Sequence, residues 1–112
     1  KNEEIKQIIY FDFDKSNLTN ISLQEINNFL IHYKSKIVKY LIVGHADTKG
    51  TNEYNLKLSL DRAKKVQIIL NESGIDNYDI KIVAKGESEL AFQTNDEIAH
   101  PANRRVEILP IN

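Results

Sequence analysis

Cysteine is absent from this chain of 112 residues. Its absence excludes disulfide bonds, thiolate catalysis and Cys-type zinc sites, although it leaves the redox compartment open. A large net charge is also lacking, because 15 basic and 16 acidic side chains leave a formal charge of −1. We therefore expect no nucleic acid partner and no electrostatic attraction to an anionic membrane surface.

Long apolar runs are lacking too. No segment approaches the roughly 20 apolar residues of a membrane span, and no signal peptide precedes the first predicted strand. The chain begins with Lys1 and not with Met, so we expect an excised domain or a mature fragment. A membrane anchor would then lie in the missing part of the protein. The length predicts a single domain, over residues 1–112.

Metal-binding spacings are missing as well. The 3 histidines, His32, His45 and His100, form no HxH or HExxH pattern, whereas a zinc site needs three or four convergent ligands. We expect no metal and no cofactor. We expect His45 to pack or to hydrogen-bond locally, and so to orient its loop.

The periodicity of the apolar residues predicts an α+β fold. Strands are expected at 8–13, 38–43, 80–84 and 105–109, and helices at 20–35 and 52–73. This order, βαβαββ, predicts a two-layer sandwich in which a mixed four-stranded sheet packs against two main helices.

Several residues are predicted to set the ends of these elements. Asn20 or Ser22 is expected to cap the first helix, and Glu25 lies three residues after Ser22, as a capping box requires. Gly74 is expected to end the second helix, and Pro110 to close the last strand. Residues 87–102 are expected to form a long loop with a helical turn near its Asp96.

One stretch carries side chains suited to binding. Asp47 lies in a loop bounded by glycines, and the helix that follows carries Asn55, Ser59 and Arg62. Positions i, i+4 and i+7 stack along one helical face, so these three side chains share a side. An anion and a cation on rigid supports suit a ligand that carries both an ammonium and a carboxylate.

Plainer roles fit the same residues taken singly. Asp47 could cap a turn or the helix, and Arg62 could pair with a neighbouring acidic residue on the helix surface. Asn55 could be an ordinary first-turn residue. Because neighbouring strand residues point to opposite faces, one of Arg104 and Arg105 is expected to face inward and the other outward.

Five motifs occur in the order and with the spacing of a known family. They are YFDFDKS at 10–16, GHADTKG at 44–50, EYN at 53–55, LSLDRA at 58–63 and NRRVE at 103–107. On these motifs the chain resembles the OmpA-like C-terminal domain over about residues 8–110. Related modules occur in Pal lipoproteins and in MotB-type stator proteins.

The resemblance implies non-covalent binding of peptidoglycan through the diaminopimelate residue of its peptide stem. It implies that Asp47 pairs with the ammonium of the ligand and that Arg62 holds its carboxylate. Phe13 and Asp14 match positions that line the same pocket, and Asn55 matches a ligand contact on the second helix.

Two more ligand-binding residues follow from the resemblance. Thr48 follows the pocket aspartate in the second motif. Arg104 belongs to the segment that closes the far wall of the pocket, together with its neighbour Arg105.

The resemblance also implies a cellular role. It places the chain in the periplasm, as a domain that tethers an outer-membrane or envelope protein to the cell wall. The alternative is a protein-interaction domain of a Pal-like lipoprotein, which docks an envelope partner through the same face. An enzyme is not expected, because the sequence shows no Ser-His-Asp or Cys-His set.

Overall fold

The computed structural model describes residues 5–33 and 38–111. The strands are β1 (Gln7–Tyr10), β2 (Lys39–Gly44), β3 (Ile80–Ala84) and β4 (Arg105–Ile111). The helices are α1 (Asn20–His32) and α2 (Asn52–Glu72), with short 3-10 turns η1 (Asn77–Asp79) and η2 (Pro101–Asn103). The predicted α+β class with a mixed four-stranded sheet is confirmed.

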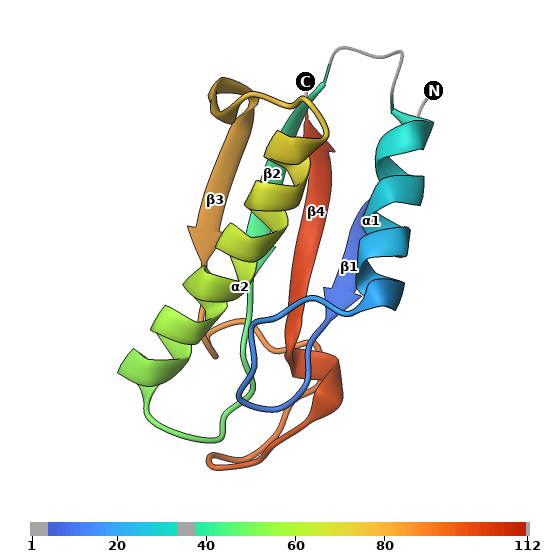
Figure 1. Ribbon diagram of the computed structural model, residues 1–112. Helices are drawn as coiled ribbons and strands as arrows, with labels where there is room; N and C mark the ends of the chain where they lie inside the picture. Colours follow the sequence, from blue (N-terminus) through green and yellow to red (C-terminus); the bar gives the residue numbers. More distant parts are fainter. Residues whose placement is uncertain (1–4, 34–37, 112) are drawn as a thin grey trace.

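The four strands form one sheet in the order β1-β4-β2-β3. β2 and β3 are parallel, whereas β4 lies between β1 and β2 and is antiparallel to both. Both helices cover the same face of this sheet (Figure 1), so the fold has two layers. Several loops meet at one end of the sheet, among them those that follow β1 and β2.

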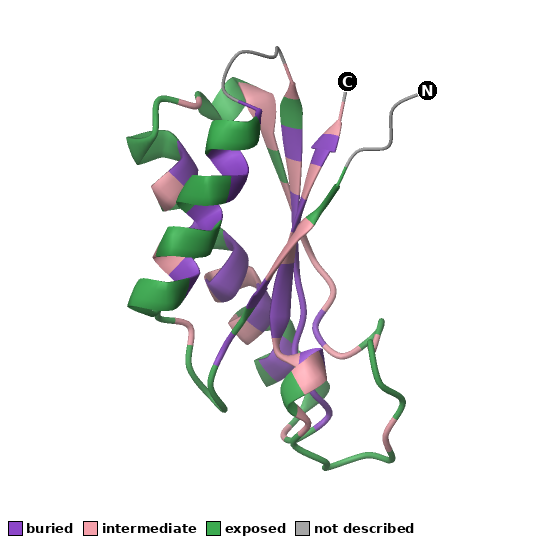
Figure 2. Cartoon of the chain, turned by 90° about the vertical axis from the view of Figure 1, so that its right-hand side faces the viewer, coloured by how far each residue is buried: buried purple, intermediate pink, exposed green. Residues whose placement is uncertain are grey.

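The core lies between the helices and the sheet. Figure 2 shows that the buried positions of the helices face the strands, while their outer sides are exposed. Six of the fully buried aliphatic side chains come from five different elements: Ile9, Ile26, Ile42, Val66, Leu70 and Ile108. Burial of such side chains contributes roughly 1.5–3 kcal/mol each, which makes this layer the main source of stability.

The helix ends follow local hydrogen-bonding rules. Thr19 caps α1, because its side chain accepts from the backbone N of Ser22 at 3.1 Å. The predicted caps at Asn20 and Ser22 are therefore wrong, since both residues lie within the first turn. The predicted end near Ser35 lies outside the described residues, and α1 ends at His32.

The end of α2 confirms the role predicted for Gly74. This glycine has φ +95°, a left-handed conformation that other residues adopt at a cost. Its N donates to the carbonyl of Asn71, and the N of Ile75 donates to the carbonyl of Leu70, both at 3.0 Å. These two bonds form a Schellman motif, which satisfies the last free carbonyls of the helix.

β1 ends earlier than predicted. The strand stops at Tyr10, although Phe11 N still donates to the carbonyl of Arg104 at 2.9 Å. The chain then turns away, because Lys15 N donates to the carbonyl of Asp12 and Asp14 has φ 58°. The alternation seen in the sequence up to Phe13 therefore belongs partly to a loop.

β4 continues through Pro110, contrary to the prediction. His45 N donates to the carbonyl of Arg105, and Phe11 N donates to that of Arg104, so backbone groups at even positions of β4 point toward β1. β1 begins at Gln7, which pairs with Ile108. Pro110 therefore faces the β1 side beyond the end of that pairing, where its missing N–H costs no ladder bond.

The long loop has its 3-10 turn at η2 and not near Asp96, where the structure has a simple turn. Glu97, with φ 61°, lies in that turn.

Within the described residues, neither helix combines the length and the apolar character that a membrane crossing requires.

Candidate functional site

A hollow of about 280 Å³ lies between the loop after β1, the loop after β2 and the first turns of α2. Five residues predicted from the sequence line it: Phe13, Asp14, Asp47, Asn55 and Arg62. The structure thus brings together residues that are up to 49 positions apart, from 13 to 62. The other two predicted site residues, Thr48 and Arg104, lie behind or beside this hollow.

The hollow depends on a close approach of α2 to the end of β2. A Cβ atom added at Gly44 would lie 1.9 Å from the carbonyl oxygen of Ser59. Only a glycine therefore allows the helix backbone to pack at this point. The contact sets the distance between the loop that holds Asp47 and the helix face that holds Asn55 and Arg62.

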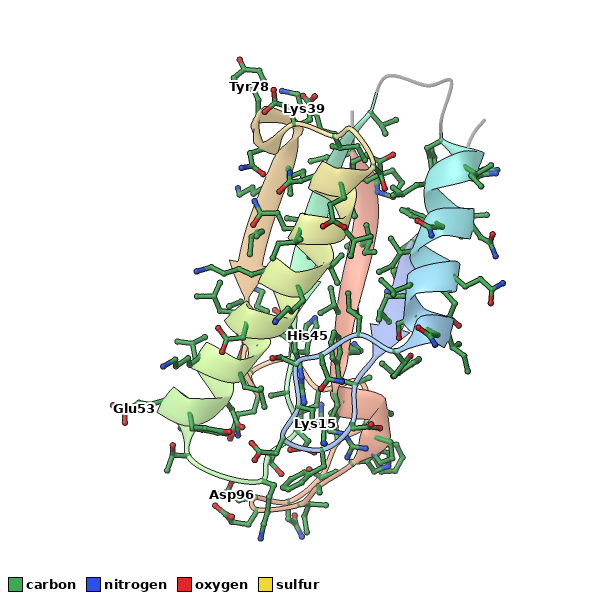
Figure 3. All side chains as sticks on the ribbon, viewed as in Figure 1. Lys15, Lys39, His45, Glu53, Tyr78 and Asp96 are labelled. Atoms are coloured by element: carbon green, nitrogen blue, oxygen red, sulfur yellow. The ribbon has the colours of Figure 1, made fainter. Side chains whose placement is uncertain are left out.

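Arg62 forms the deepest part of the site and is 0% exposed. Its Nε donates to the carbonyl of Lys15 at 2.8 Å, and its Nη1 donates to the carbonyl of His45 at 3.0 Å. Its Nη2 donates to the carbonyl of Asp12 at 3.2 Å. Asp12 and Lys15 belong to the loop after β1, and His45 directly follows β2; Figure 3 shows this end of the molecule. One guanidinium thus fastens two loops together.

The Arg62 side chain keeps its charge despite its burial. Burial lowers the pKa of Arg62 to about 10, and the negative charge of Asp47 opposes that effect. No carboxylate among the described residues forms an ion pair with Arg62, whose acceptors are all carbonyls. A guanidinium has five N–H donors, so one N–H on each Nη has no acceptor among the described residues. Within the same part of the chain, this buried cation has no carboxylate in ion-pair contact with it.

Asp47 is 4% exposed and is held by three donors. Its Oδ1 accepts from Lys49 N at 3.2 Å, and its Oδ2 accepts from His100 N at 3.1 Å. Nη1 of Arg104 lies 3.5 Å from the same Oδ2. These contacts fix the direction of the carboxylate before any ligand arrives, which lowers the entropic cost of binding.

Asn55 braces the loop from the helix side. Its Nδ2 donates to the carbonyls of Asp47 and Lys49, at 3.1 and 3.0 Å, and to Oε1 of Glu87 at 2.9 Å. The Asn55 side chain is buried. Its main contacts are therefore with the loop that presents Asp47.

The outer wall of the hollow is more exposed. Phe13 is 47% exposed, and Asp14 accepts a hydrogen bond from the hydroxyl of Tyr54. This hydrogen bond is the largest of the effects that raise the pKa of the Tyr54 hydroxyl. The left-handed backbone of Asp14 turns the loop back toward α2 and so makes this contact.

Thr48 does not line the hollow. Its Oγ1 lies 2.8 Å from the carbonyl of Asn95 and 3.1 Å from that of Ile98, and it accepts from Ile98 N at 3.0 Å. Its carbonyl also accepts from Glu97 N. Thr48 therefore anchors the turn at residues 94–98 to the loop after β2.

The two arginines of the last motif point to different sides, as predicted, although only Arg105 belongs to β4 and Arg104 caps the end of η2. Arg104 faces Asp47, and its Nε donates to the carbonyl of Phe11 at 2.9 Å. Arg105 donates from Nε to Glu107 at 2.8 Å. Because Val106 lies in the core, Arg105 and Glu107 point to the sheet face that the helices leave uncovered.

His45 lies beside this second cluster, buried on the uncovered side of the sheet. Its Nε2 is 3.9 Å from Glu107, and neither ring nitrogen has a hydrogen-bond partner among the described residues. Burial lowers the pKa of His45 to about 4, and the charge of Arg105 acts in the same direction. The ring is therefore neutral at ordinary pH.

Five residues that line the hollow were not among the predicted site residues: Lys49, Gly50, Tyr54, Leu58 and Glu97. Glu97 comes from the long loop and accepts from Gly50 N at 3.4 Å. Tyr54 and Leu58 could have been found, since Leu58 and Asn55 are three apart and Tyr54 and Leu58 four apart on α2. Glu97 is placed only by the tertiary fold.

Asn103 begins the segment 103–105, which the family resemblance predicts to close the far wall of the pocket. It is buried, and its side-chain amide both accepts from Phe92 N and donates to the Phe92 carbonyl, each at 2.8 Å. The ring of Phe92 stacks on His100 at 4.3 Å. Asn103 and Thr48 together hold the long loop against the site.

Over the described ranges, no group of three or more His, Asp or Glu side chains is arranged to hold a metal ion.

Comparison with known proteins adds an independent line of evidence. The model of the OmpA family matches residues 10–104. The chain is 34% identical over 104 residues to the peptidoglycan-associated lipoprotein of Buchnera aphidicola subsp. Baizongia pistaciae, covering 90% of this chain and 59% of that protein. It is 36% identical over 103 residues to outer membrane porin F of Pseudomonas aeruginosa, covering 88% of this chain and 29% of the porin. The chain thus spans about three-fifths of that lipoprotein and under a third of the porin.

Solved structures share the same architecture. The peptidoglycan-associated lipoprotein from Burkholderia pseudomallei gives a TM-score of 0.83 at 28% identity, covering 93% of this chain and 89% of that one. The OmpA-like domain of FopA1 from Francisella tularensis also gives 0.83, at 26% identity, covering 97% of this chain and 77% of that one. Since the family match covers nearly the whole chain and the relatives agree with it, the chain belongs to the OmpA family.

Proposed function

We propose that this chain binds peptidoglycan non-covalently through the diaminopimelate residue of the peptide stem. In this proposal residues 1–112 act as one periplasmic domain, which attaches an outer-membrane or envelope protein to the cell wall. Membership of the OmpA family and the similarity to peptidoglycan-associated lipoproteins support a wall ligand. The choice of diaminopimelate follows from the charges in the hollow.

The observation that carries the proposal is the buried, charged Arg62, which has no ion-pair partner in the described part of the chain. Burial of a cation is costly unless an anion and hydrogen bonds compensate for it. Three carbonyls supply part of this compensation, and Asp47 contributes from the same hollow. A ligand carboxylate at the two remaining N–H groups would supply the missing anion through a pair of parallel hydrogen bonds.

The rest of the ligand follows from Asp47. Meso-diaminopimelate carries a free amino-acid zwitterion at the end of its side chain, with an ammonium next to a carboxylate. Asp47 lines the hollow in a fixed orientation and offers a negative charge to that ammonium. Lysine has the ammonium but lacks the neighbouring carboxylate, so Arg62 would have no partner in a lysine-containing stem.

The proposal is tested by titration calorimetry with two tripeptides, L-Ala-γ-D-Glu-meso-diaminopimelate and the same peptide with L-lysine in the third position. We expect the first to bind and the second to bind at least tenfold more weakly, because an unpaired buried charge costs about 2–5 kcal/mol. Equal affinities would contradict the proposal that Arg62 binds the side-chain carboxylate of diaminopimelate. No binding of either peptide would contradict the proposed ligand as a whole.

A second candidate function is docking of an envelope protein through the same end of the molecule. The observation in its favour is the group of exposed apolar side chains around the hollow, Phe13, Tyr54, Phe92 and Ile98. Exposed apolar groups of this kind occur at protein interfaces. We further propose that the chain is not an enzyme, and incubation with purified peptidoglycan should release no soluble fragments.

A further inference from the structure

A second hollow, of about 390 Å³, lies next to the candidate site. Its wall is formed by Tyr10, Phe11, Asp12, Pro101, Ala102 and Arg104. The two hollows are adjacent along the chain, since Phe11 and Asp12 line the second, and Phe13 and Asp14 line the first. They also meet across the fold, because Arg104 in the second contacts Asp47 in the first.

Arg104 has donors to spare. Its Nε donates to the carbonyl of Phe11, and its Nη1 donates to Asp47 at the long distance of 3.5 Å. Its Nη2 has no acceptor among the described residues, although the side chain is largely buried, at 14% exposed. A guanidinium that is held through Nε and Nη1 and keeps Nη2 available can donate a charge-assisted hydrogen bond to a carboxylate.

The remaining wall suits a small peptide. Tyr10 is 53% exposed and presents an aromatic ring, while Pro101 and Ala102 add small apolar surface. Asp12 is the single acidic side chain of this wall, and it is exposed to solvent. An exposed carboxylate weakens the attraction of a second anion by only a modest amount, because water screens it.

We infer that the second hollow takes the continuation of the bound peptide, and that Arg104 binds a second carboxylate of the same stem. This inference rests on the proposed function, in which the diaminopimelate zwitterion occupies the first hollow. Two groups of the stem offer such a carboxylate: the α-carboxylate of the γ-linked glutamate, and the C-terminal carboxylate. Arg104 is then a specificity-determining residue. It contacts a carboxylate of the stem residue next to diaminopimelate, and it also braces Asp47.

The test uses three tetrapeptides, L-Ala-γ-D-Glu-meso-diaminopimelate-D-Ala and its two single amides. One amide replaces the glutamate α-carboxylate, as in isoglutamine, and the other replaces the C-terminal carboxylate. Each peptide is titrated by calorimetry into the wild-type chain and into Arg104→Gln. If Arg104 only braces Asp47, Arg104→Gln should weaken the binding of all three peptides by the same factor. A loss of affinity that differs between the peptides therefore indicates direct contact with Arg104.

We expect one amide to bind the wild type roughly tenfold more weakly than the acid, because it loses a charge-assisted hydrogen bond. The affinities of this amide and of the unamidated tetrapeptide for Arg104→Gln should differ less than twofold. The amide that shows this coupling identifies the carboxylate. If neither amide weakens binding to the wild type, or if the weakening persists in Arg104→Gln, the inference is wrong while the proposed function stands.

A second variant keeps the test independent of any effect on Asp47. Asp12→Asn removes the acidic group from the second hollow. It should raise the affinity of the unamidated tetrapeptide about twofold at low salt. It should leave unchanged the affinity of the amide that has lost the contact with Arg104. Lys64→Gln is the matched control for Arg104→Gln, because both remove one positive charge and Lys64 is exposed and lines neither hollow. If no peptide binds to the wild type, the proposed function fails and this inference fails with it.

Discussion

The Nδ2 of Asn55 donates to the backbone carbonyl of Asp47 at 3.1 Å, across the gap between α2 and the loop after β2. The helix therefore holds the backbone of the loop, while Lys49 N and His100 N hold the carboxylate of Asp47. The orientation of Asp47 thus depends on one bond to its backbone and on two bonds to its carboxylate. A substitution of Asn55 removes the first, and a substitution of Asp47 itself removes the other two.

Replacing Asn55 by Ala removes the helix-side bonds to Asp47, Lys49 and Glu87. Buried carbonyls then lose their donor, and we expect the free energy of unfolding to fall by about 1–3 kcal/mol. Urea unfolding measures this change. Asn17→Ala is a suitable control, because Asn17 is exposed and has no side-chain hydrogen bond within the described part of the chain. If Asn55→Ala lowers the free energy of unfolding no more than Asn17→Ala does, Asn55 does not brace the loop.

Asp47→Asn tests the proposed ammonium contact. The substitution keeps the shape of the side chain and removes its charge, so the diaminopimelate tripeptide should bind at least tenfold more weakly. Calorimetry gives the affinity, and circular dichroism checks the fold. Glu53→Gln makes the same change of charge on a side chain that points away from the site (Figure 3) and should bind like the wild type. An unchanged affinity of Asp47→Asn would remove Asp47 from the site.

Arg62→Lys separates shape from charge. A lysine keeps the positive charge but has one nitrogen, and it cannot reach the carbonyls of Asp12, Lys15 and His45 together. We expect the free energy of unfolding to fall by about 1–3 kcal/mol because buried acceptors lose their donors. Urea unfolding of Arg62→Lys beside Lys64→Arg, at an exposed position of the same helix, measures the loss. Equal stability of the two variants would refute the fastening role of Arg62.

The sequence predicted the elements well where local rules decide them. β3 spans the predicted residues 80–84, and α2 ends before Gly74 as expected, because a period-two pattern and a left-handed glycine are local signals. β1 is shorter than predicted because the alternation continues past its last residue, Tyr10, into a loop that bonds to Tyr54 of α2 and to Arg104. Pro110 fits within β4 because its backbone faces β1 beyond the last paired residue, Ile108, which no local pattern shows.

The site was predictable only in part, for a similar reason. The helical spacing of Asn55 and Arg62 and the loop position of Asp47 could be read from the sequence, and all three line one hollow. Thr48 has the right position in its motif, but its hydroxyl turns to residues 94–98. Contacts between distant loops, such as those of Glu97 and Asn103, depend on the path of the long loop, which has no period to read.

Gly44→Ala tests the close approach of α2 to β2. The added Cβ would overlap the carbonyl oxygen of Ser59, since the two atoms would be 1.9 Å apart. Backbone must move to relieve this overlap, and we expect a loss of about 3 kcal/mol or more in the free energy of unfolding, or failure to fold. At Gly74 an added Cβ meets no atom of the described residues within 4 Å, so Gly74→Ala should lose only about 1–2 kcal/mol, from its left-handed backbone. Thermal unfolding that ranks Gly74→Ala as the more damaging change would contradict this packing.

His45 should make the stability of the protein depend on pH. Burial and Arg105 lower the pKa of His45 from 6.5 to about 4 in the folded state, against the smaller opposing effects of Glu107 and Glu89. The unfolded chain therefore binds this proton more readily than the folded chain, and stability falls as the pH drops from 6.5 toward 4. The full loss below pH 4 is on the order of 3 kcal/mol for this group.

Two measurements check the dependence on His45. In an NMR titration the ring protons of His45 should not shift until the pH approaches 4, whereas a shift midpoint near 6.5 would show that the ring is not held neutral by burial. Urea unfolding at pH 7 and pH 4.5 gives the change in stability for the wild type and for His45→Gln, which cannot be protonated in this range. The part of the pH dependence that disappears in His45→Gln belongs to this histidine. His45 lies two residues before Asp47, directly after β2. Its protonation would put a positive charge, 3.9 Å from Glu107, beside the loop that presents Asp47, and binding of the diaminopimelate tripeptide should weaken over the same range of pH.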